Sequence, residues 1–120
     1  MFEYLGRPGS DVRAIVFTGE GKHFTAGLDL TSAVSMQGMN DSEKDPARTA
    51  IDFFQVVSPL QESVSSLEKV RVPVIAAING LCIGAGVDLC SAADIRIASK
   101  GSKFTIKEVD IGLAADIGTL

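Results

Sequence analysis

The run "VPVIAAI" at residues 72–78 is the feature that most limits how this chain can fold. It is apolar throughout and ends at Asn79-Gly80, a pair that is typical of tight turns. An apolar run of this length without alternation indicates a buried strand. Such strands occur in parallel sheets on which helices pack, so the run predicts an α/β fold.

The other predicted elements alternate between strand and helix. "RAIVFTG" (13–19) is a second apolar, β-branched run, and it stops at a Gly-Glu-Gly turn. A helix is expected over roughly 46–70, with Pro59 as a kink, because apolar residues recur there at helical spacing. The alternation implies largely parallel strand pairing. The remaining predicted elements are a glycine-rich turn into a short helix in "CIGAGVDLCSAAD" and two strands at 95–99 and 104–109.

Composition narrows the class of protein. The 120 residues fit one domain, and 46% hydrophobic with 22% charged residues is ordinary for a folded globular chain. The net charge of -4 comes without a basic block, which argues against a nucleic-acid partner. No apolar run approaches the ~18 residues of a membrane span. Cys82 and Cys90 lack the spacing of a metal site, so we expect reduced thiols and no bound metal.

The segment "GAGVDL" begins like a nucleotide-binding motif but does not complete one. Leu89 stands where a dinucleotide fingerprint requires its third glycine, and no Gly-Lys-Ser/Thr follows. The turn can still present backbone N–H groups around Ala85 at a helix N-terminus, where they can hold an anion or a developing oxyanion. Close packing of the helix on a strand explains the same glycines equally well.

The segment "GKHFTAGLDL" (21–30) offers a second candidate for ligand contact. The small residues Ala26 and Gly27 allow a ligand to approach the backbone closely. His23 has no neighbour in sequence that would orient it for catalysis, so a surface or structural role is expected. Asp29 has the residue type of a helix cap as well as that of a ligand contact.

Two carboxylates flank an apolar stretch near the end of the chain. Glu108 and Asp116 bracket "IGLAA", which has the composition of a buried wall. A buried carboxylate costs several kcal/mol unless it is paired, hydrogen-bonded or protonated. The residues alone leave two explanations open, namely acid–base chemistry or a structural ion pair with a lysine. For Asp88 the residues also leave two explanations open, a role in chemistry or a structural role as a helix cap.

Three motifs in order, "HFTAGLDL", "PVIAAINGLCIGAGVDLCSAADIRIAS" and "FTIKEVDIGLAADIGTL", resemble the crotonase (enoyl-CoA hydratase/isomerase) superfamily over nearly all of residues 13–120. The resemblance implies a crotonase-like spiral of β-β-α units, of which residues 1–120 would form a partial acyl-CoA-binding domain, incomplete at both ends. Within the superfamily the chain is most similar to Δ3,5-Δ2,4-dienoyl-CoA isomerases, because it carries Asp88, Glu108 and Asp116. A hydratase would be expected to have Glu at position 88 and no acid at 116.

The resemblance implies an acyl-CoA thioester substrate and no other cofactor, since coenzyme A is part of the substrate. The backbone N–H groups of Leu28 and Ala85 would form an oxyanion hole for an enolate. The residues expected to line the coenzyme A are Ala26, Gly27, Leu28, Asp29 and Leu30.

The three acids receive roles from the same resemblance. Glu108 would exchange a proton at the α-carbon, Asp116 would act at the distal carbon, and Asp88 would tune both. The implied activity is isomerisation of 3,5-dienoyl-CoA to 2,4-dienoyl-CoA in fatty-acid β-oxidation. Alternatives are 2-enoyl-CoA hydration and an inactive, truncated homologue.

The resemblance also implies a homotrimer or hexamer for the full-length protein, in the mitochondrial matrix, the peroxisome or both. We expect residues 1–120 alone to be inactive and poorly soluble, with 72–78 lacking a packing partner and 13–19 exposed as an edge strand.

Overall fold

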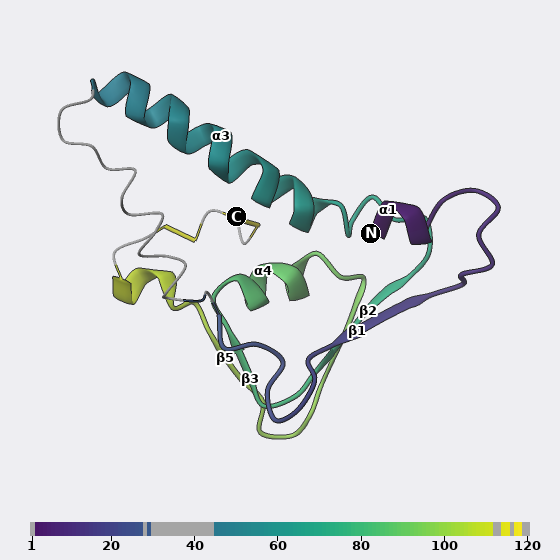
Figure 1. Ribbon diagram of the computed structural model, residues 1–120. Helices are drawn as coiled ribbons and strands as arrows, with labels where there is room; N and C mark the ends of the chain where they lie inside the picture. The colour runs from purple at the N-terminus through teal and green to yellow at the C-terminus, as the bar shows by residue number, and fades with distance from the viewer. Residues whose placement is uncertain (1, 28, 30–44, 112–113, 116, 119–120) are drawn as a thin grey trace.

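A computed structural model describes residues 2–27, 29, 45–111, 114–115 and 117–118 (Figure 1). Its strands pair only in parallel among these residues, which confirms the predicted α/β class. The elements are α1 (Phe2–Leu5), β1 (Ile15–Thr18), α3 (Pro46–Ser65), β2 (Val74–Ile78), β3 (Leu81–Ile83), α4 (Ala85–Ser91), β4 (Ile95–Ala98), β5 (Lys103–Thr105) and the 3₁₀ helix η1 (Glu108–Ile111).

The strands form two sheets. The first has the order β1-β2-β4, so the apolar run predicted as a buried strand lies in its centre. The second pairs β3 with β5, and Thr25 adds an isolated parallel bridge to Cys82 on β3. Since parallel strands end at the same edge of a sheet, the segments that follow β3 and β5 come together. This edge positions the candidate site.

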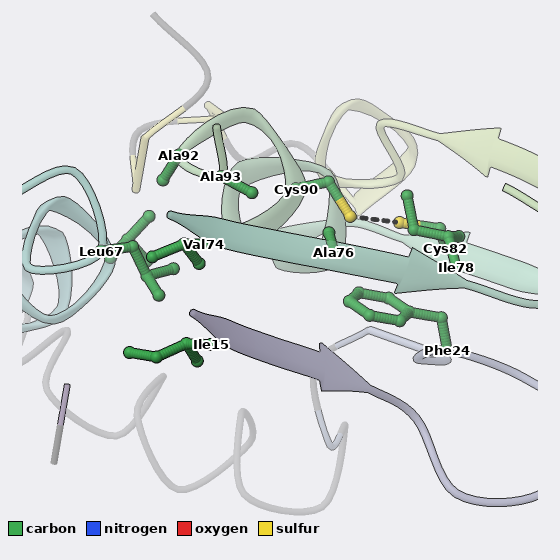
Figure 2. Close-up of a cluster of buried hydrophobic side chains, with 11 residues drawn as sticks. Ile15, Phe24, Leu67, Val74, Ala76, Ile78, Cys82, Cys90, Ala92 and Ala93 are labelled. Atoms are coloured by element: carbon green, nitrogen blue, oxygen red, sulfur yellow. Dashed lines mark hydrogen bonds between the residues drawn. The ribbon is translucent and has the colours of Figure 1, made fainter. Parts of the chain in front are cut away.

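The core lies on one face of the first sheet (Figure 2). Val74, Ala76 and Ile78 point inward from β2 and are almost fully buried. Leu67 covers one end of β2, and the far end contacts Phe24 and the two cysteines. The opposite face of the sheet remains open, with Val16 62% and Ile97 61% exposed. The predicted buried strand is confirmed on this face of β2, whereas Ile75 and Ala77 on its other face are half-buried. The expectation that residues 72–78 lack a packing partner is wrong for the buried face.

Helix α3 begins as the sequence predicts but ends five residues early. Asp45 accepts a hydrogen bond from the N–H of Ala47, and Pro46 occupies the first helical turn, where its missing N–H costs nothing. Near the other end, the hydroxyls of Ser63 and Ser66 donate to backbone carbonyls, which offers the chain an alternative to the helical pattern. The helix ends at Ser65, and Leu67 reaches the core from the turn that follows.

One further strand differs from its predicted bounds, and one strand was not predicted. The strand expected over 104–109 covers only Lys103–Thr105, and Glu108 starts a 3₁₀ helix instead. This helix carries an exposed ion pair between Lys107 and Asp110. Strand β3 was not predicted, because three residues after a turn give too little pattern to recognise. Among the helices that the structure describes, none combines the length and apolar character needed to cross a bilayer.

Candidate active site

The first part of the candidate site is the loop at residues 24–27, which runs along β3. The N–H of Thr25 donates to the carbonyl of Leu81 at 3.0 Å, and the N–H of Ile83 donates to the carbonyl of Thr25 at 3.3 Å. Gly27 follows directly, and a Cβ there would lie 3.3 Å from Cγ2 of Ile83. The loop predicted to approach a ligand is thus held against the carboxyl end of β3.

The second part is the turn that leads from β3 into α4. Gly84 has φ 57° and ψ -128°, a left-handed conformation that a side chain would strain. Its N–H donates to the carbonyl of Thr105 at 2.9 Å, which ties the turn to the end of β5. Helix α4 then starts at Ala85, as predicted. The first N–H groups of a helix have no acceptor within it, and the N–H of Ala85 is one of these groups.

Glu108 brings a carboxylate to this turn. A Cβ at Gly84 would lie 2.7 Å from Oε1 of Glu108, so the carboxylate occupies the space beside the Gly84 backbone. Its Oε2 atom is buried and receives no hydrogen bond from the residues that the structure describes. A carboxylate oxygen held out of water without a donor is costly to the fold, which is the pattern expected of a group retained for chemistry.

Asp88 lies on the same helix as Ala85, three residues further along and hence on the same side. It is the one buried charged residue among those described, at 1% exposure. The chain returns to this helix near its end, where a Cβ at Gly118 would lie 3.5 Å from Cβ of Asp88. The hydroxyl of Ser91 donates to the Asp88 carbonyl at 2.7 Å and lies 3.4 Å from the Gly118 carbonyl.

Apart from Asp88, the predicted site residues fall into three groups. The structure brings Glu108, the Ala85 turn and the Gly27 loop to one edge of the β3–β5 sheet. Ala26 and Asp29 are exposed. Leu28, Leu30 and Asp116 lie outside the described residues.

His23 has the structural role that the sequence favoured. Its Nδ1 atom accepts a hydrogen bond from the N–H of Leu81 at 3.2 Å. Next to it, a Cβ at Gly80 would lie 2.5 Å from the same Nδ1 atom. His23 thereby holds the turn that precedes β3 and makes no contact with Glu108 or Asp88 that the structure records.

Two residues that shape the site, Gly84 and Thr25, were not predicted from the sequence. Gly84 positions Glu108, and the only signal was its place in a glycine-rich turn. Thr25 contacts both the Gly27 loop and α4, and no local pattern in the sequence points to it.

The two cysteines meet where α4 packs on β3, with Cys90 on the helix and Cys82 on the strand (Figure 2). Their sulfur atoms are 3.7 Å apart, and both side chains are buried. Burial raises the pKa of the Cys90 thiol to about 12, and the contact with Cys82 adds to this effect. Burial also raises the pKa of the Cys82 thiol, although its hydrogen bond with Cys90 acts in the opposite direction.

These thiols should make the fold sensitive to alkali. A raised pKa means that the folded chain holds the thiol proton more tightly than the unfolded chain, in which a cysteine thiol has a pKa of about 8.5. The stability that the folded state gains from this tighter proton binding is complete below about pH 8.5 and is lost as the pH rises toward about 12. In urea unfolding above about pH 9, Cys90→Ala should reduce the loss of stability by up to ~1.4 kcal/mol per pH unit relative to the wild type. Parallel pH profiles for the two proteins would contradict this.

The arrangement of strands, helix and carboxylate at this edge defines the class of protein. Parallel strands with a helix N-terminus and the half-buried carboxylate of Glu108 at their carboxyl ends define an α/β protein. The family model described as Enoyl-CoA hydratase/isomerase matches residues 2–120. The chain belongs to this family, and its described elements are part of the crotonase fold.

Individual relatives are consistent with this assignment. The chain is 51% identical over 111 residues to the mitochondrial Δ(3,5)-Δ(2,4)-dienoyl-CoA isomerase of Mus musculus, covering 92% of this chain and 34% of the relative. It is 44% identical over 110 residues to the peroxisomal Δ(3,5)-Δ(2,4)-dienoyl-CoA isomerase of Arabidopsis thaliana, covering 92% and 40%. A probable peroxisomal enoyl-CoA hydratase of the same plant is less similar, at 36% identity over 104 residues, covering 85% and 33%. The chain thus spans 34–40% of the length of the two isomerases.

Solved structures agree on the fold. A putative enoyl-CoA hydratase from Thermobifida fusca YX, determined in complex with acetoacetyl-CoA, superposes with a TM-score of 0.73 at 32% identity. The match covers 98% of this chain and 47% of that one.

Proposed function

We propose that the protein containing this chain converts 3,5-dienoyl-CoA to 2,4-dienoyl-CoA, and that this chain supplies the oxyanion hole and the acid–base groups. The observation that carries the proposal is the position of Glu108, whose carboxylate adjoins the turn bearing the Ala85 N–H. The similarity to two isomerases adds support, because the hydratase relative is less similar.

The reaction moves one proton from C2 of the acyl chain to C6. Glu108 accepts the C2 proton, and the electron pair spreads over the diene and onto the thioester oxygen. The N–H groups of Ala85 and Leu28 donate to that oxygen and stabilise its charge. Asp116 then donates a proton to C6, which leaves double bonds at C2 and C4. Exchange with solvent returns Glu108 to its ionised form and Asp116 to its protonated form.

Asp88 is assigned a tuning role. Its 1% exposure places a carboxyl group in a medium where charge is poorly solvated. Burial and nearby charge are the two effects that hold one carboxyl group protonated while another is ionised. Two acids of different protonation state are what a proton transfer over four carbons requires.

Relatives also suggest where the protein works and how it assembles. The two isomerases are named as mitochondrial and peroxisomal, and we assign the same compartments and a role in fatty-acid β-oxidation to this protein. Assembly into trimers or hexamers is proposed on the family resemblance.

The activity assay is direct. The full-length protein, given 3,5-dienoyl-CoA without added metal or redox cofactor, should produce the strong ultraviolet absorbance of a 2,4-dienoyl-CoA. With 2-enoyl-CoA it should show little loss of the conjugated enoyl absorbance. Fast hydration of 2-enoyl-CoA without diene formation would make the hydratase assignment correct instead.

A further inference from the structure

Thr25 touches both halves of the proposed oxyanion hole with one side chain. Its Oγ1 atom accepts a hydrogen bond from the N–H of Gly27 at 3.2 Å. Gly27 precedes Leu28, the residue proposed as the first donor. The hydroxyl of Thr25 is therefore bound to the loop that leads into this donor.

The methyl group of the same side chain lies against α4. A Cβ at Gly86 would overlap Cγ2 of Thr25, while its next contacts would be Sγ of Cys82 at 3.4 Å and Cβ of Thr25 at 3.6 Å. Gly86 follows Ala85, the second proposed donor. The absence of a side chain at position 86 is what lets the Thr25 methyl reach the helix backbone.

The backbone of Thr25 is itself fixed. It bonds on both sides to β3, to Leu81 and to Ile83, at 3.0 and 3.3 Å. The side chain thus extends from backbone that is held to β3 on both sides, with its hydroxyl on one loop and its methyl on the helix. A side chain anchored in this way determines how far apart the loop and the helix lie.

We propose that Thr25 is a positioning residue that sets the separation between the Gly27 loop and the N-terminus of α4, and with it the spacing of the two oxyanion donors. Donors must lie about 2.7–3.1 Å from the developing oxyanion, and a shift of ~1 Å can cost ~10²-fold in rate. The inference rests on the proposed function, because the spacing matters to catalysis only if both donors bind the enolate.

Four variants of the full-length protein separate the hydroxyl from the methyl. Thr25→Val keeps the shape but removes the acceptor of Gly27, and kcat should fall by about 10–100-fold with KM changed by less than about threefold. Thr25→Ser keeps the acceptor, and kcat should stay within about fivefold. Gly86→Ala should lower kcat and stability through its overlap with the Thr25 methyl. The double variant Thr25→Ser/Gly86→Ala moves the methyl from one residue to the other, and it should recover most of what Gly86→Ala loses.

A structural role alone predicts a different pattern. Thr18→Val is the matched control, since it also removes one hydroxyl–backbone hydrogen bond, here from the Thr18 hydroxyl to the carbonyl of Ala77 at 2.8 Å, but lies away from the turn. It should lower the melting temperature without changing kcat. Thr25→Val with wild-type kcat, or a double variant no better than Gly86→Ala alone, would overturn the proposal.

A binding readout keeps this test independent of isomerisation. Acetoacetyl-CoA forms an enolate when its C2 proton is lost to Glu108 or to solvent, and hydrogen bonds to its thioester oxygen stabilise that enolate, so the enolate absorbance at fixed pH reports the oxyanion hole. Thr25→Val should reduce that absorbance at saturating ligand, and Thr25→Ser should retain it. If the wild type fails to isomerise dienoyl-CoA yet shows this difference, the proposed reaction is wrong and the role of Thr25 stands. If Thr25→Val enolises the ligand as the wild type does, the role of Thr25 is wrong.

Discussion

Glu108→Gln in the full-length protein should lower kcat for dienoyl-CoA isomerisation by about 10²–10⁴-fold, the usual cost of removing a general acid–base group. The amide keeps the size of the side chain but cannot accept the C2 proton. It should also leave stability unchanged or higher, because Oε2 of Glu108 is buried without a donor among the described residues and an amide is cheaper to bury. Steady-state kinetics and thermal melting measure the two effects together.

Asp110→Asn is the matched control for this substitution. It makes the same kind of change two residues away in η1 and breaks only an exposed ion pair with Lys107. Exposed pairs of this kind contribute ~0–1 kcal/mol, so kcat should stay within about twofold. If Glu108→Gln behaves like Asp110→Asn, Glu108 is not the group that exchanges the C2 proton.

Asp116→Asn should reduce isomerisation by a similar factor of about 10²–10⁴ but leave one partial reaction intact. Because Glu108 would still remove the C2 proton, substrate incubated in deuterium oxide should gain deuterium at C2 at close to the wild-type rate. Glu108→Gln should abolish both that exchange and the formation of product. Mass spectrometry of the recovered thioester distinguishes the two variants.

Two other outcomes would change the roles assigned to Glu108 and Asp116. Loss of C2 exchange in Asp116→Asn with retention in Glu108→Gln would exchange the assignments of the two acids. Near-normal isomerisation by Asp116→Asn would contradict the two-acid mechanism, and hydration of 2-enoyl-CoA would then be the better assignment.

The closeness of Glu108 to the Ala85 turn could not be predicted from local sequence patterns. The sequence predicted a strand through residue 109, which would have carried Glu108 about 10 Å beyond Thr105, at ~3.3 Å per residue. The strand ends at Thr105 instead, and the chain turns into η1. This turn is what places the carboxylate beside Gly84.

Features that depend on neighbours along the chain were predictable from local sequence patterns. The apolar run at 72–78 predicted the central strand β2, and the glycine-rich turn predicted a short helix that starts at Ala85. The order of three motifs identified the family, which the match over residues 2–120 confirmed. Periodicity and turn chemistry carry this information because they reflect the backbone within a few residues.

Which of these features meet depends on contacts between residues that are far apart in sequence. Gly84 and Thr105 are joined because β3 and β5 pair in parallel, and Thr25 reaches Gly86 because the loop at 24–27 adds to the other edge of β3. Which face of β2 is buried was decided in the same way, by the side on which Leu67 and α4 pack. Such contacts join residues far apart in sequence, and strand register and side-chain packing determine them rather than any local pattern.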